Sequence, residues 1–314
     1  MNTHEHAQAH VTPHESSVLR LARSALAGHV LLIAFSTVAL TTIVAGPLPV
    51  SLQSGIPAEI YRLGWKFSGP TYVMLGALAA LLHAAGHLGW RRATGMFVAA
   101  CLLSLGAELM GTTTGIPFGA YQYTTLLGYR IAGHVPFPIP LSWFFMIYSA
   151  LAISSRVLPA RDELRIRVLW AAVAGLILTA WDVAMDPAMS NATKHWVWDT
   201  SGVYFGMPLT NWLGWWGTGS LIAFAMLAIT PPTLWRRAVS MTRLPLALYA
   251  INGVLPIALC ARHGLWGAAA LGALAMGVPL VLAVRAPLRR DPVRGGQPVA
   301  GGRSWVAGAA FAER

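Results

Sequence analysis

The chain has few charged residues, and acidic residues are the scarcest of them. Of its 314 residues only 11 are Asp or Glu, charged residues make up 11%, and apolar residues make up 56%. Soluble globular domains carry about 25% charged residues. Together with a mean hydropathy of +0.58, this composition excludes a soluble globule and predicts a polytopic membrane protein.

Several other features are also missing. There are only two cysteines, Cys101 and Cys260, and both lie in apolar segments, which excludes a disulfide framework and favours a small hydrophobic role for each. No cationic segment leads directly into a short apolar core with a cleavage site, so we expect the first apolar helix to be retained. No basic run alternates with aromatics, so nucleic acid is not an expected partner, and no strong internal repeat suggests a transporter built from two halves.

Long apolar runs are abundant instead. A transmembrane helix needs about 20 apolar residues, and continuous runs of this length exclude the alternating strands of a β-barrel. We therefore predict an all-α, polytopic transmembrane bundle in one catalytic domain, residues 25–285, between a flexible tail at 1–24 and a flexible basic tail at 286–314. The predicted spans are residues 25–46, 70–90, 93–112, 139–158, 166–186, 209–231, 244–262 and 264–285.

The distribution of basic residues predicts the orientation of this bundle. The two tails and the connections after the second, fourth and sixth spans carry 17 of the 22 Lys and Arg residues. By the positive-inside rule both termini are expected in the cytoplasm, in a multi-pass protein of the cytoplasmic (inner) membrane. Topology and contact with anionic membrane lipids then explain the net charge of +11.

Three acids occupy positions at membrane depth. A carboxyl group there costs about 2.5 kcal/mol or more, so such residues usually mark a functional site. Glu108 shares a helical face with Ser104, Gly111 and Gly115. Asp182 and Asp186 lie one turn apart, before Pro187, which we expect to end their helix. Since the third and fifth spans run in the same direction, the three acids are predicted to share one pocket.

Two long connections, 112–138 and 187–208, are rich in Gly, Pro and aromatic residues. We predict that both lie on the extracytoplasmic face as partly re-entrant segments packed on protein, because irregular backbone is tolerated at membrane depth only in such surroundings. The alternative is that the acids are structural hydrogen-bond partners and the aromatics form an interfacial belt. Candidate substrate-binding residues in or near these connections are Phe118, Tyr121, Tyr123, Trp143, Trp196, Trp198, Tyr204, Asn211, Trp212 and Trp215.

Two sequence segments carry a family resemblance. The first is Glu108-Leu-Met-Gly-Thr-Thr-Thr-Gly-Ile-Pro-Phe-Gly-Ala-Tyr-Gln-Tyr; the second is Asp182-Val-Ala-Met-Asp-Pro, followed by Trp196-Val-Trp and Tyr204-Phe-Gly-Met-Pro-Leu-Thr-Asn-Trp-Leu-Gly-Trp. Over residues 100–220 the chain resembles the membrane carotenoid hydratases, which include bacterial lycopene and γ-carotene hydratases and archaeal bisanhydrobacterioruberin hydratases.

The resemblance implies a cofactor-independent hydro-lyase. It would add water to the terminal C-1,2 double bond of an acyclic carotenoid that arrives from the lipid phase, with other carotenoid-pathway enzymes as possible partners. Such chemistry needs a protonated carboxyl to protonate the alkene, aromatic faces to stabilise a tertiary cation, and a base to position water. We assign Asp186 as the acid, Asp182 as the neighbour that keeps it protonated, and Glu108 as the base.

Three other functions remain open at this point. Asp182 and Asp186 resemble the aspartate clusters of membrane prenyltransferases, but a second cluster is missing and only Lys194 and Arg130 could meet a diphosphate. A lipid or isoprenoid transporter would also contain intramembrane acids.

A di-iron hydroxylase is the remaining alternative. His83 and His87 have the i, i+4 spacing of two metal ligands on one helix. His134 and His195 are predicted at the opposite membrane face, so no metal site is assigned.

Overall fold

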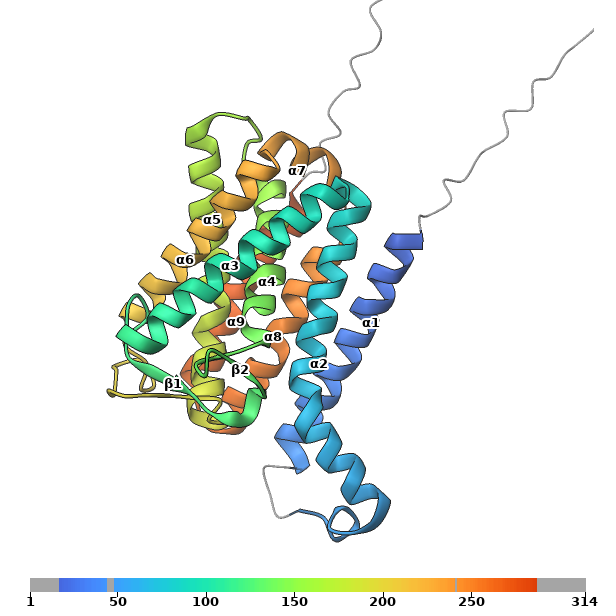
Figure 1. Ribbon diagram of the computed structural model, residues 1–314, viewed down its shortest axis with the longest axis vertical. Coiled ribbons are helices and arrows are strands. Elements are labelled where there is room, and N and C mark those ends of the chain that lie inside the picture. Colours follow the sequence, from blue (N-terminus) through green and yellow to red (C-terminus); the bar gives the residue numbers. More distant parts are fainter. Residues whose placement is uncertain (1–16, 44–47, 241, 287–314) are drawn as a thin grey trace, which may run out of the picture.

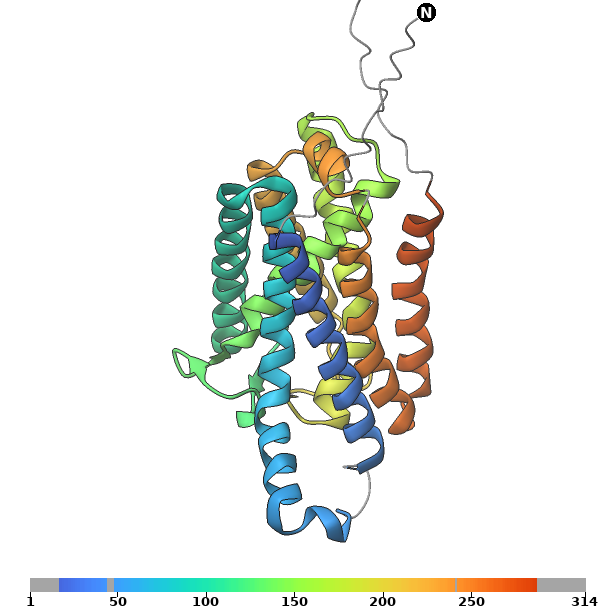
Figure 2. The same cartoon turned by 90° about the vertical axis from the view of Figure 1, so that its right-hand side faces the viewer.

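The computed structural model describes residues 17–43, 48–240 and 242–286 as a bundle of long helices (Figure 1). In these ranges eight helices are long and apolar enough to cross a membrane. The expected number of spans is therefore confirmed. Ser17 and Arg285 lie at one end of the bundle, as an even number of spans requires (Figure 2). Which end faces the cytoplasm stays a prediction.

The spanning helices are joined by short helices and strands at both ends. The helices are α1 (Ser17–Val38), α2 (Gly55–Leu88), α3 (Trp90–Thr114), α4 (Pro138–Val157), α5 (Leu164–Pro187), α6 (Thr210–Ile229), α7 (Pro232–Ala238), α8 (Leu244–Arg262) and α9 (Trp266–Arg285). Two π-helices, η1 (Ala39–Ile43) and η4 (Ala188–Ala192), extend α1 and α5. The 3₁₀ turns are η2 (Val50–Leu52) and η3 (Thr125–Leu127), and the strands are β1 (Tyr121–Tyr123), β2 (Arg130–Ile131), β3 (Val135–Pro136) and β4 (Trp196–Trp198).

Helix α4 forms the centre of the bundle. Of its most apolar 18-residue segment, 83% is buried inside the protein, a larger share than in any other described span. Consecutive residues Trp143, Phe144 and Phe145 are all buried, so the helix is enclosed on every side. Since α3, α5, α8 and α9 all contact it, α4 fixes the relative positions of the helices that carry the acids.

Helices α5 and α6 approach each other closely through glycines. A Cβ atom on Gly175 would lie 2.8 Å from the carbonyl oxygen of Trp216, and one on Gly219 would lie 2.9 Å from Leu178 Cδ2. Small residues let membrane helices pack backbone against backbone. This contact places the start of α6 beside the end of α5.

The structure corrects the predicted starts of two helices. Helix α1 begins at Ser17, so residues 17–24 of the predicted tail are helical, while residues 1–16 and 287–314 lie outside the described residues. Helix α2 begins at Gly55 and contains Pro70, where we had expected it to start. A count of apolar residues finds the segment that suits lipid, whereas hydrogen bonding continues the helix beyond it.

Pro187 does not end its helix, contrary to our expectation. The chain continues as the π-helix η4, in which Thr193 N donates to Ala188 O, five residues earlier, at 3.1 Å. Proline removes the backbone donor that would reach Val183 O, and the Tyr204 hydroxyl donates to that oxygen instead. The polypeptide therefore remains helical for a further turn beyond Asp186.

The two long connections are joined to each other at the end of the bundle where β1 and β2 lie (Figure 1). Strand β1 of the first pairs antiparallel with β4 of the second, with Tyr121 opposite Trp198 and Tyr123 opposite Trp196. Strands β2 and β3 form a second antiparallel pair. The loops are thus one folded unit across the ends of α3, α4 and α5.

Candidate active site

Glu108 accepts hydrogen bonds from three aromatic side chains. It lies on the buried face of α3 with Ser104 and is 3% exposed. The Tyr121 hydroxyl donates to Oε2, the Tyr123 hydroxyl donates to Oε2 at 2.9 Å, and Trp143 Nε1 donates to Oε1 at 2.9 Å. Each carboxyl oxygen has two acceptor positions, so one position on Oε1 is left.

Asp186 has an equivalent arrangement on α5. Trp196 Nε1 donates to its Oδ2, while Trp198 Nε1 and Ser190 Oγ donate to Oδ1, each at 3.1 Å. Three acceptor positions are filled here too, and one on Oδ2 remains. The π-helix η4 supplies Ser190, and the strand β4 supplies both tryptophans.

The β1–β4 pairing explains why four aromatic donors reach the two acids. Side chains alternate across a strand, and directly paired residues project to the same face. Tyr121 and Trp198 form one such pair and Tyr123 and Trp196 the next, with ring centroids 5.3 and 5.9 Å apart. The intervening Val197 points outward and is 42% exposed.

The two tyrosines stay protonated donors. Burial, and then the nearby Glu108 carboxylate, raise the pKa of Tyr121 and of Tyr123 well above the usual value for a phenol. Their hydroxyl protons are therefore available to Glu108 throughout the physiological pH range.

Asp182 lies one turn before Asp186 but has a different environment. It is fully buried, and its Oδ2 accepts from Asn211 Nδ2 at 2.9 Å. Its Oδ1 is buried and hydrogen bonds to no residue that the structure describes. Burying a carboxylate oxygen without a hydrogen-bond donor is costly, which disfavours two ionised carboxyls one turn apart on α5.

Glu108 and Asp186 line one cavity of about 60 Å³, here called the acid cavity. A cavity needs roughly 10–15 Å³ to hold one water, so this one has room for a few waters or a small branched group. Asp182 does not line it. Of the predicted substrate-binding residues, the acid cavity is lined by Phe118, Tyr121, Tyr123, Trp143, Trp196, Trp198, Asn211 and Trp215.

Two predicted residues lie elsewhere. Tyr204 and Trp212 do not line the acid cavity. Their rings contact each other at 4.6 Å, and the Tyr204 hydroxyl donates to the carbonyl oxygen of Val183 at 3.0 Å. The aromatic density of their segment did not distinguish a cavity wall from packing against α5.

Four lining residues were not predicted: Ile139, Ser142, Trp181 and Met185. Met185 lies three residues after Asp182, so helical periodicity places it on the face of the aspartates, a signal that sequence reasoning could have used. Trp181 meets the ring of Trp215 at 5.9 Å in an edge contact, and Trp215 stacks on Trp143 at 4.5 Å. Three aromatic rings in mutual contact therefore form one part of the cavity wall.

The histidine pair lies in another part of the bundle. His83 Nδ1 is 2.7 Å from the Tyr148 hydroxyl, and the rings of His83 and His87 are 4.5 Å apart. Among the described residues no group of three or more His, Cys, Asp and Glu side chains is arranged to hold a metal ion. His83 is hydrogen-bonded within the bundle, and its ring is tilted at 49° to that of His87.

Comparisons with known proteins point to carotenoid metabolism. A family described as carotenoid biosynthesis protein matches residues 68–279. The chain is also similar to the bisanhydrobacterioruberin hydratase of Haloarcula japonica, with 33% identity over 131 residues, which are 42% of this chain and 43% of that protein. The chain thus spans less than half of the curated relative that it matches. No solved structure matches the chain.

Proposed function

The chain belongs to the carotenoid biosynthesis protein family, and from that membership we propose that it is a carotenoid 1,2-hydratase, which adds water to the terminal double bond of an acyclic carotenoid end of the lycopene or γ-carotene type. The curated relative is named as a hydratase, which supports this reaction class. The observation that carries the proposal is the meeting of Glu108 and Asp186, from two helices, at one aromatic cavity.

The reaction needs a proton donor. A trisubstituted alkene is a weak base, so the acid must be a protonated carboxyl in contact with the double bond. We assign this role to Asp186, whose Oδ2 has one position left to carry the proton. The proton goes to C-2 with the alkene electron pair, which leaves a tertiary cation at C-1.

Aromatic rings and the second carboxyl complete the addition. The stacked Trp143 and Trp215 line the acid cavity, and a desolvated cation over an aromatic face gains about 2 kcal/mol. Water then attacks C-1 and transfers one proton to Glu108, which gives the tertiary alcohol. Proton return from Glu108 to Asp186 through water resets the site, so neither metal nor cofactor enters the scheme.

Asp182 acts on Asp186 and not on the substrate in this proposal. It lies one helical turn away and outside the acid cavity. A second carboxyl at that distance disfavours two negative charges and so keeps one proton on the pair. Asn211, which donates to Asp182, also lines the acid cavity and links the two.

Product analysis of matched variants tests the function. The chain and its Asp186→Asn, Glu108→Gln and Asp182→Asn variants are expressed in a lycopene-producing host, with Asp199→Asn, an exposed acid beside β4, as the control. We expect a pigment heavier by one water from the wild type and the control. Loss of general acid or base catalysis should lower its formation about 10²–10⁴-fold in Asp186→Asn and Glu108→Gln.

Full activity in all three acid variants would remove the assignment of roles. An unchanged pigment profile from the folded, membrane-inserted wild type would contradict the proposed hydratase activity. Product that forms only with Mg²⁺ and a prenyl diphosphate would favour a prenyltransferase, and binding of isoprenoid without any product would favour a transporter.

A further inference from the structure

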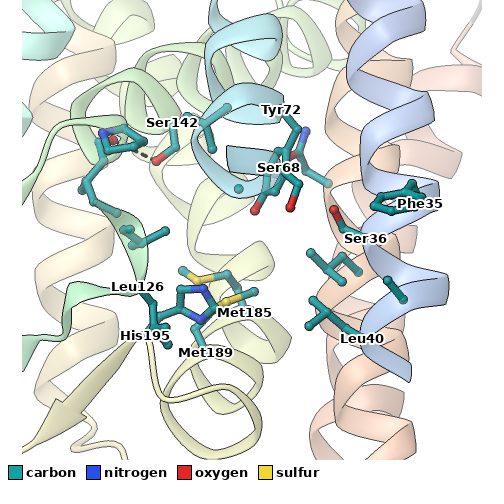
Figure 3. A pocket seen from close by; sticks show the side chains of 18 of the residues that line it. Phe35, Ser36, Leu40, Ser68, Tyr72, Leu126, Ser142, Met185, Met189 and His195 are labelled. Carbon is teal, nitrogen blue, oxygen red and sulfur yellow. Dashed lines mark hydrogen bonds between the residues drawn. The ribbon is translucent and has the colours of Figure 1, made fainter. Parts of the chain in front are cut away.

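A second, larger cavity adjoins the acid cavity. It has a volume of about 140 Å³ and lies between α1, α2, α4, α5 and α8 (Figure 3). It shares five lining residues with the acid cavity, which are Ile139, Ser142, Trp181, Met185 and Trp196. Since the same side chains border both spaces, a ligand in one lies directly beside the other.

Its walls suit an apolar chain. Phe35 of α1 and Leu40 of η1 face Met185 of α5 and Met189 of η4 across the space (Figure 3). Methionine adapts readily to an apolar ligand. Asn252, which also lines the space, is held within the protein, because its Nδ2 donates to Leu248 O at 2.7 Å.

The other polar groups of the lining are few. Ser142 Oγ donates to Ile139 O at 2.8 Å, and His195 Nδ1 is 2.6 Å from Thr193 Oγ1. The α1 and α2 wall adds the hydroxyl-bearing residues Ser36, Tyr61, Ser68 and Tyr72, of which Ser36, Ser68 and Tyr72 are labelled in Figure 3.

The cavity borders the outside of the bundle at the wall formed by α1 and α2. Phe35 lines the cavity and is nevertheless 54% exposed, so its ring lies at the boundary. Gly64 of α2 faces it, and a Cβ atom there would lie 3.7 Å from Phe35 Cε1. The neighbouring Leu63 and Phe67 are about half exposed. Apolar side chains exposed on spanning helices face lipid.

We propose that this second cavity, the isoprenoid cavity, binds the chain of an acyclic isoprenoid that enters sideways from the lipid between α1 and α2. This proposal rests on the proposed function, since the terminal double bond must reach the acid cavity. The carbons next to that bond then occupy the isoprenoid cavity. A carotenoid is far longer than both cavities, so its remainder leaves past Phe35 and stays in the lipid.

Two glycines offer a matched test. Gly69 lines the isoprenoid cavity and Gly106 lies on the exposed face of α3; in both cases no atom lies within 4 Å of an added Cβ. Both glycines lie inside helices, and neither has a positive φ. Gly69→Phe therefore fills the isoprenoid cavity, whereas Gly106→Phe places the same side chain in lipid.

Binding can be measured without catalysis. Lycopene is achiral, so its visible absorption shows circular dichroism only when a protein holds it in a chiral site. Purified full-length protein in phosphatidylcholine nanodiscs containing lycopene should give this signal in the wild type, in Asp186→Asn and in Gly106→Phe. We expect Gly69→Phe to weaken binding about tenfold or more, which corresponds to about 1.4 kcal/mol.

A series at Gly69 guards against misfolding. Lycopene binding should weaken progressively with side-chain volume from Gly69→Ala to Gly69→Leu to Gly69→Phe. The same three substitutions at Gly106 should leave binding unchanged. Equal binding throughout the Gly69 series would overturn the proposal. The same experiment distinguishes this proposal from the hydratase proposal. If the dichroism changes with the Gly69 substitutions but no hydrated product forms, the isoprenoid cavity is supported and the hydration reaction is not.

Discussion

At the residue scale, most hydrogen-bond donors to the two cavity acids come from other elements than the helices that carry the acids. Glu108 is on α3, but its partners come from β1 and α4; Asp186 is on α5, but its tryptophans come from β4. Hydrogen bonds to a charged group contribute about 1.5–3 kcal/mol each. The positions of the acids are therefore set largely by residues outside their own helices.

Removing the tyrosine hydroxyls should impair catalysis and leave the fold intact. In Tyr121→Phe and Tyr123→Phe one donor to Glu108 is lost, and loss of about 1.5–3 kcal/mol predicts a rate roughly 10- to 100-fold lower. The measurement is hydrated product per unit of purified protein. Tyr129→Phe, at a residue 73% exposed, is the control. Wild-type rates in the double variant would show that Glu108 needs neither donor.

His195 should make the protein sensitive to acid. Burial lowers the pKa of His195 from 6.5 to about 4, so between these values the unfolded chain binds a proton that the native protein does not. Its contribution to stability is complete above pH 6.5 and is lost as the pH falls toward 4. In His195→Asn the loss of folding stability between pH 6.5 and 4 should be smaller by about 1–3 kcal/mol.

The measurement is the thermal unfolding midpoint in detergent as a function of pH. The exposed His134 provides the control, since His134→Asn should follow the wild-type curve. If His195→Asn and the wild type lose stability in parallel between pH 6.5 and 4, burial of His195 has no role in the acid response.

At the scale of elements, two contacts build the site: the β1–β4 pairing and the close packing of α5 on α6. The first brings two loops together that are separated by more than 70 residues, as the Gln122–Val197 pairing shows. The second brings Asn211, at the start of α6, to Asp182 at the end of α5. Apolar run lengths located both helices but contain no information about these pairings.

Gly175 is the residue of this helix contact at which an added side chain has the least room. Gly175→Leu would push its Cβ against the α6 backbone, where Trp216 O and Ser220 N lie within 3.0 Å. Overpacking of this kind costs about 1–3 kcal/mol, so the unfolding midpoint in detergent should fall. Gly217→Leu, on the exposed face of α6 with no atom within 4 Å, should leave it unchanged. Equal midpoints for the two variants would contradict the close contact.

At the scale of the whole molecule, the acid cavity lies near the end of the bundle that carries β1 to β4, and the positive-inside rule predicts that this end faces away from the cytoplasm. The family match begins at residue 68, so α1 and the first part of α2 lie outside it. The wall that these helices add to the isoprenoid cavity is the part of the molecule where we expect substrate preference to differ among relatives.

Labelling of single cysteines tests the orientation. Tyr129→Cys lies in the connection between α3 and α4, and Arg161→Cys lies in the connection between α4 and α5; both side chains are largely exposed. A membrane-impermeant maleimide should label Tyr129→Cys in intact cells and Arg161→Cys only after permeabilisation. Of the two native cysteines, Cys260 is buried and Cys101 is partly exposed on α3, so the unsubstituted chain is labelled in parallel to give the background. The reverse labelling pattern would show that the bundle has the opposite orientation in the membrane.

The sequence by itself determined the number of spans, the family resemblance, and the choice of Glu108, Asp182 and Asp186, because lipid penalises every uncompensated charge and so makes each intramembrane acid conspicuous. Tertiary structure decided what those acids contact. It put Glu108 and Asp186 at one cavity, left Asp182 behind it, moved Tyr204 and Trp212 outside, and opened a second cavity beside the first. Strand register and helix packing depend on contacts between distant segments, and no local pattern of residues records them.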